Sequence, residues 1–177
     1  MKLNKLFLAG AILAAFTFTS CDDDNDDVDN TPNTADTDFM LKASLSNSAA
    51  VGMSTLAVTK ATNVAVKAFA QTMVPEHTTA QAELKTLGTN VGYVVKDTID
   101  PAHGTLITQL NGRTGRAFDS SYIWVQVADH QTELTNFQAE QTAGRNSSVV
   151  AFANTNLPKV QAHFTRADSI ARAYFPR

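Results

Sequence analysis

Two stretches that repeat each other decide the fold of this chain: VKAFAQTMVP at residues 66–75 and VVAFANTNLP at residues 149–158. Their identical spacing predicts two equivalent helices, each forming one half of an αα-hairpin. Each stretch ends in a proline that lies within an otherwise helical pattern. Because proline lacks a backbone N–H, it costs a helix interior about 3 kcal/mol unless the helix kinks or restarts there. We therefore expect kinks at Pro75 and Pro158.

Outward from these stretches, apolar residues recur at alternating spacings of three and four from Phe39 onward. This spacing is typical of helices that pack as a bundle. It predicts an all-α domain over residues 38–177, a four-helix bundle built from two αα-hairpins. We expect its helices at residues 38–60, 64–87, 118–143 and 149–174.

The connection between the second and third expected helices, residues 89–114, is the long one. Gly88 is expected to end the helix before it, and a short helical turn is expected around residues 106–110. The connection is long enough to cross the whole bundle. An up-down bundle and a ferritin-like bundle with a crossover therefore both remain open.

The N-terminus has the pattern of a bacterial export signal. Lys2 and Lys5 precede an apolar run at residues 6–16, which is long enough for a signal peptide but short for a membrane span. Phe18-Thr19-Ser20-Cys21 then resembles a lipobox, in which small residues precede a cysteine that becomes lipidated. We expect residues 1–20 to be a lipoprotein signal peptide and Cys21 to carry the lipid. Since Cys21 is the chain's only cysteine, no intramolecular disulfide competes for it.

Residues 21–37 are expected to form an acidic, disordered tether, because their carboxylates repel one another and almost nothing apolar can be buried. The lipid would anchor the protein in the cell envelope as an outer-membrane lipoprotein, either facing the periplasm or exposed at the surface. Beyond residue 38 the chain is weakly basic, and its cations are scattered rather than clustered. This distribution argues against nucleic-acid binding. A protein or small-molecule partner cannot be identified from the sequence.

Three histidines, His77, His130 and His163, fall on the core stripes of three different expected helices, each near the helix centre. They should converge at one level of the bundle. A ring of inward imidazoles can ligate a transition metal, and Glu133 could add a carboxylate. The alternative is that they are structural core histidines, hydrogen-bonded to one another, to Asn156 or to carbonyls that the prolines leave free.

No catalytic residue is predicted. A di-iron site of ferritin type would require Glu-x-x-His sequences, and the chain contains none. The single cysteine is assigned to the lipid, and no serine has the setting of a nucleophile. Asp119, Tyr122 and Trp124 are interpreted as structural, and His103 is expected to face solvent. Two functions remain: a non-enzymatic binding or structural module, or a metal-binding or metal-dependent oxidoreductase that uses the core histidines.

Several of these residues also carry a resemblance to a known family. The segments FAQTMVPEH at residues 69–77 and FDSSYI at residues 118–123, together with His130, Leu157-Pro158 and His163, resemble the domain of unknown function 4142 family. The resemblance implies an exported or outer-membrane protein with a ferritin-like helical bundle and no established biochemical role. In that family a glutamate in the first helix usually faces the core. The matching position here is Ala50, which weakens the case for a carboxylate-rich metal centre.

Overall fold

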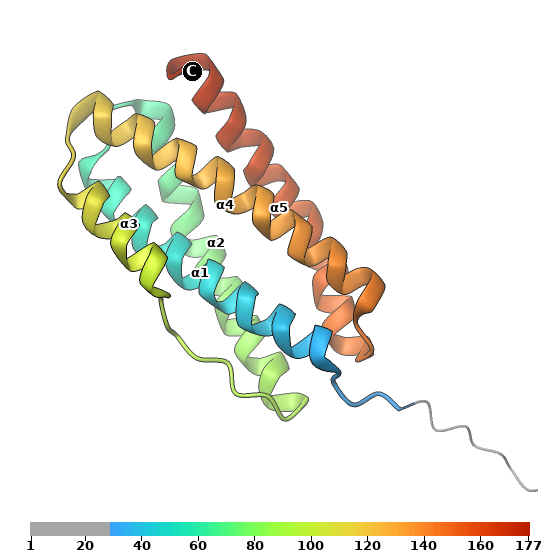
Figure 1. The fold of residues 1–177 in the computed structure, drawn as a ribbon. Helices are drawn as coiled ribbons and strands as arrows, with labels where there is room; N and C mark the ends of the chain where they lie inside the picture. Colours follow the sequence, from blue (N-terminus) through green and yellow to red (C-terminus); the bar gives the residue numbers. More distant parts are fainter. Residues whose placement is uncertain (1–28) are drawn as a thin grey trace, which may run out of the picture.

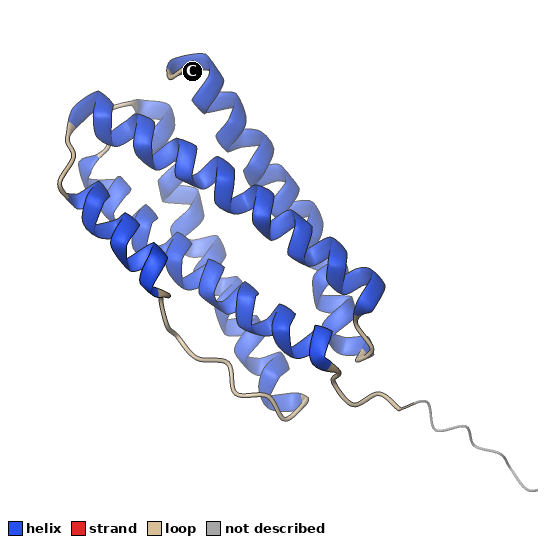
Figure 2. Cartoon of the chain, viewed as in Figure 1, coloured by secondary structure: helices blue, strands red, loops and turns tan. Residues whose placement is uncertain are grey.

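The computed structural model describes residues 29–177, and in this range the chain is all α-helical (Figure 2). It forms five helices: α1 (Thr34–Lys60), α2 (Val64–Asn90), α3 (Pro101–Asn111), α4 (Gly115–Ala143) and α5 (Ser147–Tyr174). The expected signal peptide, lipidated Cys21 and most of the acidic tether lie outside the described residues. None of the five helices is both long enough and apolar enough to cross a membrane.

The four long helices pack as two hairpins, α1 with α2 and α4 with α5, and α1 also packs along α4 (Figure 1). The contact between α2 and α5 is looser, and the candidate site opens there. The fifth helix, α3, extends well beyond the helical turn expected around residues 106–110. Its start is specified locally, because the Asp100 carboxylate caps the backbone N–H groups of Ala102 and His103 and Pro101 occupies the first helical turn.

The connection between α2 and α4 crosses the length of the domain (Figure 1). Near its start, the Ser44 hydroxyl in the first half of α1 donates to the carbonyl of Lys96. Near its end, Lys60 at the last turn of α1 contacts Asn111. The chain therefore returns along α1 before α4 begins, which decides the question of topology in favour of a crossover.

The first helix begins at Thr34, four residues before the expected start at Asp38. Asn33 and Asp36 form a reciprocal capping box, in which each side chain accepts a hydrogen bond from the other residue's backbone N–H. Asn30 contacts the turn before α5, where its side chain accepts from the N–H of Ser147 at 2.7 Å. The disordered tether was predicted to run to residue 37, but these contacts hold residues 30–37 against the domain, so a tether would end before residue 30.

Two buried carboxylates hold the helix–helix turns in matching ways. Asp36 accepts hydrogen bonds from the backbone N–H groups of Arg145 and Asn146, and Asp119 accepts from those of Thr62 and Asn63. These two sets are related by a constant shift of 83 positions (36 to 119, 62 to 145, 63 to 146), which also relates the two repeated stretches. The repeat seen in α2 and α5 therefore extends over both hairpins.

Both α2 and α5 continue through their prolines, so neither helix restarts at Pro75 or Pro158. The second helix also runs two residues past Gly88, where it was expected to end. A side chain at Gly88 would collide with the backbone of Tyr93, since an added Cβ would lie 2.7 Å from the Tyr93 carbonyl oxygen. Glycine is thus required there by the close return of the chain.

The core consists of two apolar clusters. Between them lies a polar layer, which includes the buried side chains of Asn47, His77 and His130. One cluster includes Phe69, Met73 and Ile123, and the other includes Leu84 and Leu134. The histidine positions of α2, α4 and α5 separate the two clusters along each helix. The fold therefore places the histidines at mid-height of the domain.

Candidate metal centre

The structure brings His77, His130 and His163 together from α2, α4 and α5. Their ring centroids are 5.3–5.5 Å apart, and one ring nitrogen from each lies within 4.8 Å of the other two. His77 and His130 are almost completely buried, and His163 is 12% exposed at its side chain. The helical register thus predicted the meeting of the three rings correctly.

His77 is oriented by an asparagine of α1. Its Nδ1 donates to the Asn47 side-chain oxygen at 2.9 Å, while the Asn47 amide nitrogen donates to Gln81. Because Nδ1 carries the hydrogen in this arrangement, Nε2 carries the lone pair. That nitrogen is buried and has no hydrogen-bond partner. Burial, followed by the neighbouring His130 and His163, holds the pKa of His77 well below its ordinary value.

His130 is oriented by its own helix. Its Nδ1 lies 2.8 Å from the backbone carbonyl of Gln126, one turn earlier in α4. A carbonyl oxygen can only accept, so Nδ1 carries the hydrogen and Nε2 carries the lone pair. This Nε2 is also buried and unpartnered. Burial lowers the pKa of His130 to about 4, which keeps the imidazole neutral at neutral pH.

His163 is oriented by a carboxylate from the facing helix. Its Nε2 donates to Glu76 Oε2 at 2.5 Å, and Glu76 is about half exposed at the surface between α2 and α5. In the neutral imidazole this leaves the lone pair on Nδ1. As in the other two rings, that nitrogen is buried without a partner.

The three rings therefore share one arrangement, in which one nitrogen is hydrogen-bonded to a residue outside the cluster and the other is buried in the cluster without a partner. Three buried acceptors that face one another cannot satisfy each other, since none of them carries a hydrogen, and unsatisfied buried acceptors cost free energy. A single cation placed among them would satisfy all three at once. Outward bonds from ligand histidines to a carboxylate, an amide or a backbone carbonyl are also the usual way in which proteins fix metal-binding imidazoles.

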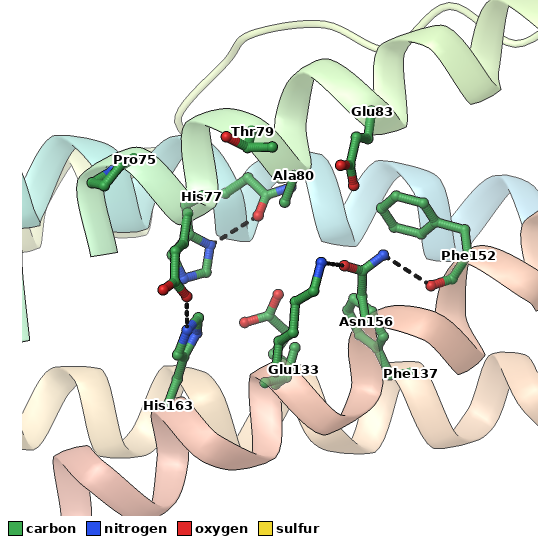
Figure 3. Close-up of a pocket in the computed structure, with 14 residues that line it drawn as sticks. Pro75, His77, Thr79, Ala80, Glu83, Glu133, Phe137, Phe152, Asn156 and His163 are labelled. Atoms are coloured by element: carbon green, nitrogen blue, oxygen red, sulfur yellow. Dashed lines mark hydrogen bonds and ion pairs between the residues drawn. The ribbon is translucent and has the colours of Figure 1, made fainter. Parts of the chain in front are cut away.

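Glu133, the fourth predicted ligand, does not join the three facing nitrogens. It is buried one turn after His130 and lies between His163 and Asn156 in the wall of a cavity (Figure 3). Burial, with a contribution from Asp129, raises the pKa of the Glu133 carboxyl to about 8. Because its carboxyl oxygens are not among the ligand atoms that lie within 4.8 Å of one another, Glu133 borders the three rings rather than joining them.

Asn156 is one of the alternative hydrogen-bond partners that the sequence offers for the histidines, but it donates to the Phe152 carbonyl and accepts from Lys159. One expectation about this region is wrong. His103 was expected to face solvent. Its ring instead packs between α3 and α4, where Nδ1 contacts Asp100 and Nε2 lies 3.6 Å from Asp129.

Sequence reasoning missed the residues that orient the rings. Asn47 is a buried amide among the small apolar residues of α1, and it occupies the position 83 residues before His130. Those two facts could have identified it. Nothing in the sequence identifies Glu76 as the partner of His163, because the pairing depends on how closely α2 approaches α5.

A cavity of about 430 Å³ opens between α2 and α5, beside His77, His130 and His163, which we call the histidine triad (Figure 3). His77 and His163 form part of its wall, together with Glu133. The rest of its wall is largely apolar and includes Phe137, Phe152 and Val160. A metal ion held by the three histidines would therefore lie next to this space.

Comparisons with known proteins support the fold and the family. A comparison with functionally curated proteins gives no match. Among solved structures, the chain is similar to the crystal structure of a DUF305 fragment from Deinococcus radiodurans, with a TM-score of 0.71 and 9% identity. The match covers 81% of this chain and 99% of that one, and at this identity it shows a shared fold alone. The family profile described as domain of unknown function (DUF4142) matches residues 24–170, and the chain therefore belongs to this family.

Proposed function

We propose that this protein binds one transition-metal ion through His77, His130 and His163. The observation that carries the proposal is the set of three buried, unpartnered ring nitrogens that face one another, each on a ring whose other nitrogen is fixed. A purely structural histidine layer would be expected to pair these nitrogens with donors. Here the N–H group of each ring is bonded to a residue outside the three histidines, and a cation would supply what the centre lacks.

The geometry suits a tetrahedral or trigonal ion bound by imidazole. Zinc–nitrogen bonds of about 2.0–2.1 Å hold tetrahedral ligand nitrogens about 3.3 Å apart. The facing nitrogens lie within 4.8 Å of one another, so small rotations of the three rings close the site. Neutral imidazoles without a carboxylate favour zinc or copper over magnesium, calcium or manganese. Iron chemistry of the di-iron type has no support, since Ala50 and the absence of Glu-x-x-His remove its carboxylates.

The scaffold for this site is best described as a ferritin-like four-helix bundle. The four long helices α1, α2, α4 and α5 supply the bundle, and α3 belongs to the crossover. This assignment rests on the crossing connection and on the convergence of side chains from facing helices at mid-height, which is where bundles place metal sites.

We also propose that the protein lies in the cell envelope. A signal peptide at residues 1–20 and a lipid on Cys21 would tether the domain to a membrane through the acidic segment. Asn30, nine residues after Cys21, contacts the turn before α5, so the lipid would hold the end of the domain that contains Asn33 and the α4–α5 turn closest to the bilayer. A metal-binding domain in this position would meet metal ions outside the cytoplasm.

The metal proposal is tested by titrating the untagged full chain with Zn²⁺ and with Cu²⁺. We expect one equivalent to bind, measured by calorimetry and by elemental analysis after gel filtration, and the thermal midpoint to rise with bound metal. His130→Ala should abolish stoichiometric binding, because it removes one of three ligands. Asn47→Ala should weaken binding about 10- to 100-fold, because it releases the ring of His77.

The matched control is His103→Ala, which removes a histidine outside the triad. It should leave stoichiometry and affinity unchanged. Equal loss of binding in His103→Ala and His130→Ala, or binding that survives in both, would show that the metal sits elsewhere and would refute the proposal.

A further inference from the structure

We propose that the cavity between α2 and α5 binds a small organic anion, whose charged group completes the coordination of the metal and whose apolar part fills the cavity. This inference rests on the proposed metal site and adds a ligand to it. Its basis is the position of the cavity, the chemistry of its wall and the number of protein ligands in the site.

The protein supplies three ligands, which leaves one position of a tetrahedral ion open. Helix α1 is the only long helix without a ligand, since it presents Asn47 and Ala50 at this level. Metal sites that bind an exogenous molecule keep such an open position, whereas structural sites close it with a fourth side chain. His77 and His163 lie in the wall of the cavity, so an ion between them borders the space from which a further ligand can approach.

The size and wall of the cavity favour an organic molecule over water alone. Its volume of about 430 Å³ falls in the range of small-molecule sites, which typically enclose about 300–1,000 Å³. Pro75, Phe137 and Phe152 give it apolar walls (Figure 3), and Val160 adds to them. Such a surface gains free energy by taking up an apolar group.

Charge favours an anion as the coordinating group. The ligand imidazoles carry no negative charge to offset a divalent ion. Of the carboxyl groups in the cavity wall, Glu76 is committed to His163, Glu83 is exposed to solvent, and Glu133 does not join the three rings. Lys159 adds a cation to the cavity wall, where its ammonium donates to the buried Asn156 side chain at 3.0 Å. Although Lys159 is exposed, this hydrogen bond keeps its ammonium at the rim of the cavity. A carboxylate could therefore bind the metal and remain near Lys159.

The test uses the untagged full chain loaded with Co²⁺, whose visible absorption reports its coordination. Elemental analysis first establishes one Co²⁺ per chain. The protein is then titrated separately with acetate, benzoate and neutral benzamide. We expect benzoate to change the cobalt spectrum in a saturable way and to bind at least tenfold more tightly than acetate, because its ring fills the apolar cavity. Benzamide should produce no comparable change.

Lys159→Gln should weaken benzoate at least fivefold and leave the Co²⁺ stoichiometry unchanged. The control is Lys42→Gln, which removes an exposed lysine that does not line this cavity and should have no effect. Bound Co²⁺ without any spectral response to benzoate, or an equal response to benzamide, would overturn the anion site while leaving the metal site in place. Failure of Co²⁺ to bind would overturn the metal proposal and this inference with it.

Discussion

Replacing His130 with glutamine should make the stability of the metal-free protein less sensitive to acid. Burial lowers the pKa of His130 to about 4 in the folded protein, whereas an unfolded histidine titrates near 6.5. Between these two values the unfolded state binds more protons than the folded state. The free energy of unfolding therefore falls as the pH falls through this window.

The size of the effect follows from the two pKa values. Relative to pH 8, the buried imidazole of His130 costs about 1.4 kcal/mol of stability at pH 5.5 and about 2.5 kcal/mol at pH 4.5. His77 acts in the same direction. Glu133 opposes both, because burial raises its pKa to about 8 and the folded state then binds more protons than the unfolded state between about pH 4.5 and 8. The informative quantity is therefore the difference between the wild type and the variant, in which the Glu133 contribution cancels.

The assay is urea unfolding followed by circular dichroism at pH 8, 5.5 and 4.5, with EDTA present throughout. The variant has a lower free energy of unfolding at pH 8 if glutamine packs less well than histidine, but its deficit should shrink by about 2.5 kcal/mol at pH 4.5. His103→Gln is the control, and its difference from the wild type should not follow this pattern. A deficit of His130→Gln that stays constant from pH 8 to pH 4.5 would show that the imidazole is not buried in a neutral form.

Three further predictions follow from other residues. Glu133→Gln should stabilise the metal-free protein by about 4 kcal/mol at pH 8 and by less than about 0.5 kcal/mol at pH 4.5, because burial raises the pKa of Glu133 to about 8 and glutamine removes a carboxyl group that ionises far more readily in the unfolded state; equal effects at both pH values in the urea assay would contradict this. Asp119→Ala should destabilise the domain by about 3 kcal/mol, because it leaves the N–H groups of the α1–α2 turn without their charged acceptor. Asp168→Ala breaks an exposed ion pair with Arg172 and should cost less than about 0.5 kcal/mol. Similar losses of stability in thermal unfolding of the two variants would refute the structural role of Asp119. Cys21→Ser should abolish labelling by a radioactive fatty acid and move the protein to the soluble fraction, and unchanged membrane association would rule out the lipid anchor.

The sequence predicts the histidine triad better than it predicts what surrounds the triad. The register of a helix is set by its 3.6-residue period, so His77, His130 and His163 could be assigned to inward faces from apolar spacing alone. The second nitrogen of each ring is hydrogen-bonded to a residue that the spacing does not identify. For His77 and His163 this partner lies on another helix, and for His130 it is a backbone carbonyl. Residue spacing contains no information of this kind, and Asn156 was therefore considered where Asn47 is the partner.

The same distinction holds for the helices: features set by repeated apolar spacing were predicted, and features set by single side chains were not. Four long helices and the long connection were predicted, because they depend on repeated apolar spacing. The early start of α1 and the full extent of α3 were missed. Both depend on single capping side chains, Asn33 with Asp36 and Asp100 with its two N–H partners. The crossing direction of the connection was left open, because chain length permits both topologies.

If the three histidines bind metal as proposed, the sequence repeat favours one ion over two. The shift of 83 positions preserves the residues that build the fold, such as Asp36 with Asp119 and Asn63 with Asn146. The shift does not preserve the polar residues near the site. In the first hairpin, Asn47, Ala50 and Ala80 occupy the positions of His130, Glu133 and His163. In the second hairpin, Val160 occupies the position of His77. A two-metal site on a two-fold scaffold requires matching ligands in both halves. Two of the three histidines come from the second hairpin, and at the matching position the first hairpin supplies the orienting amide of Asn47. Under the proposed metal binding, the three imidazoles would therefore hold a single ion, and its fourth position would be open to a molecule that the protein does not itself provide.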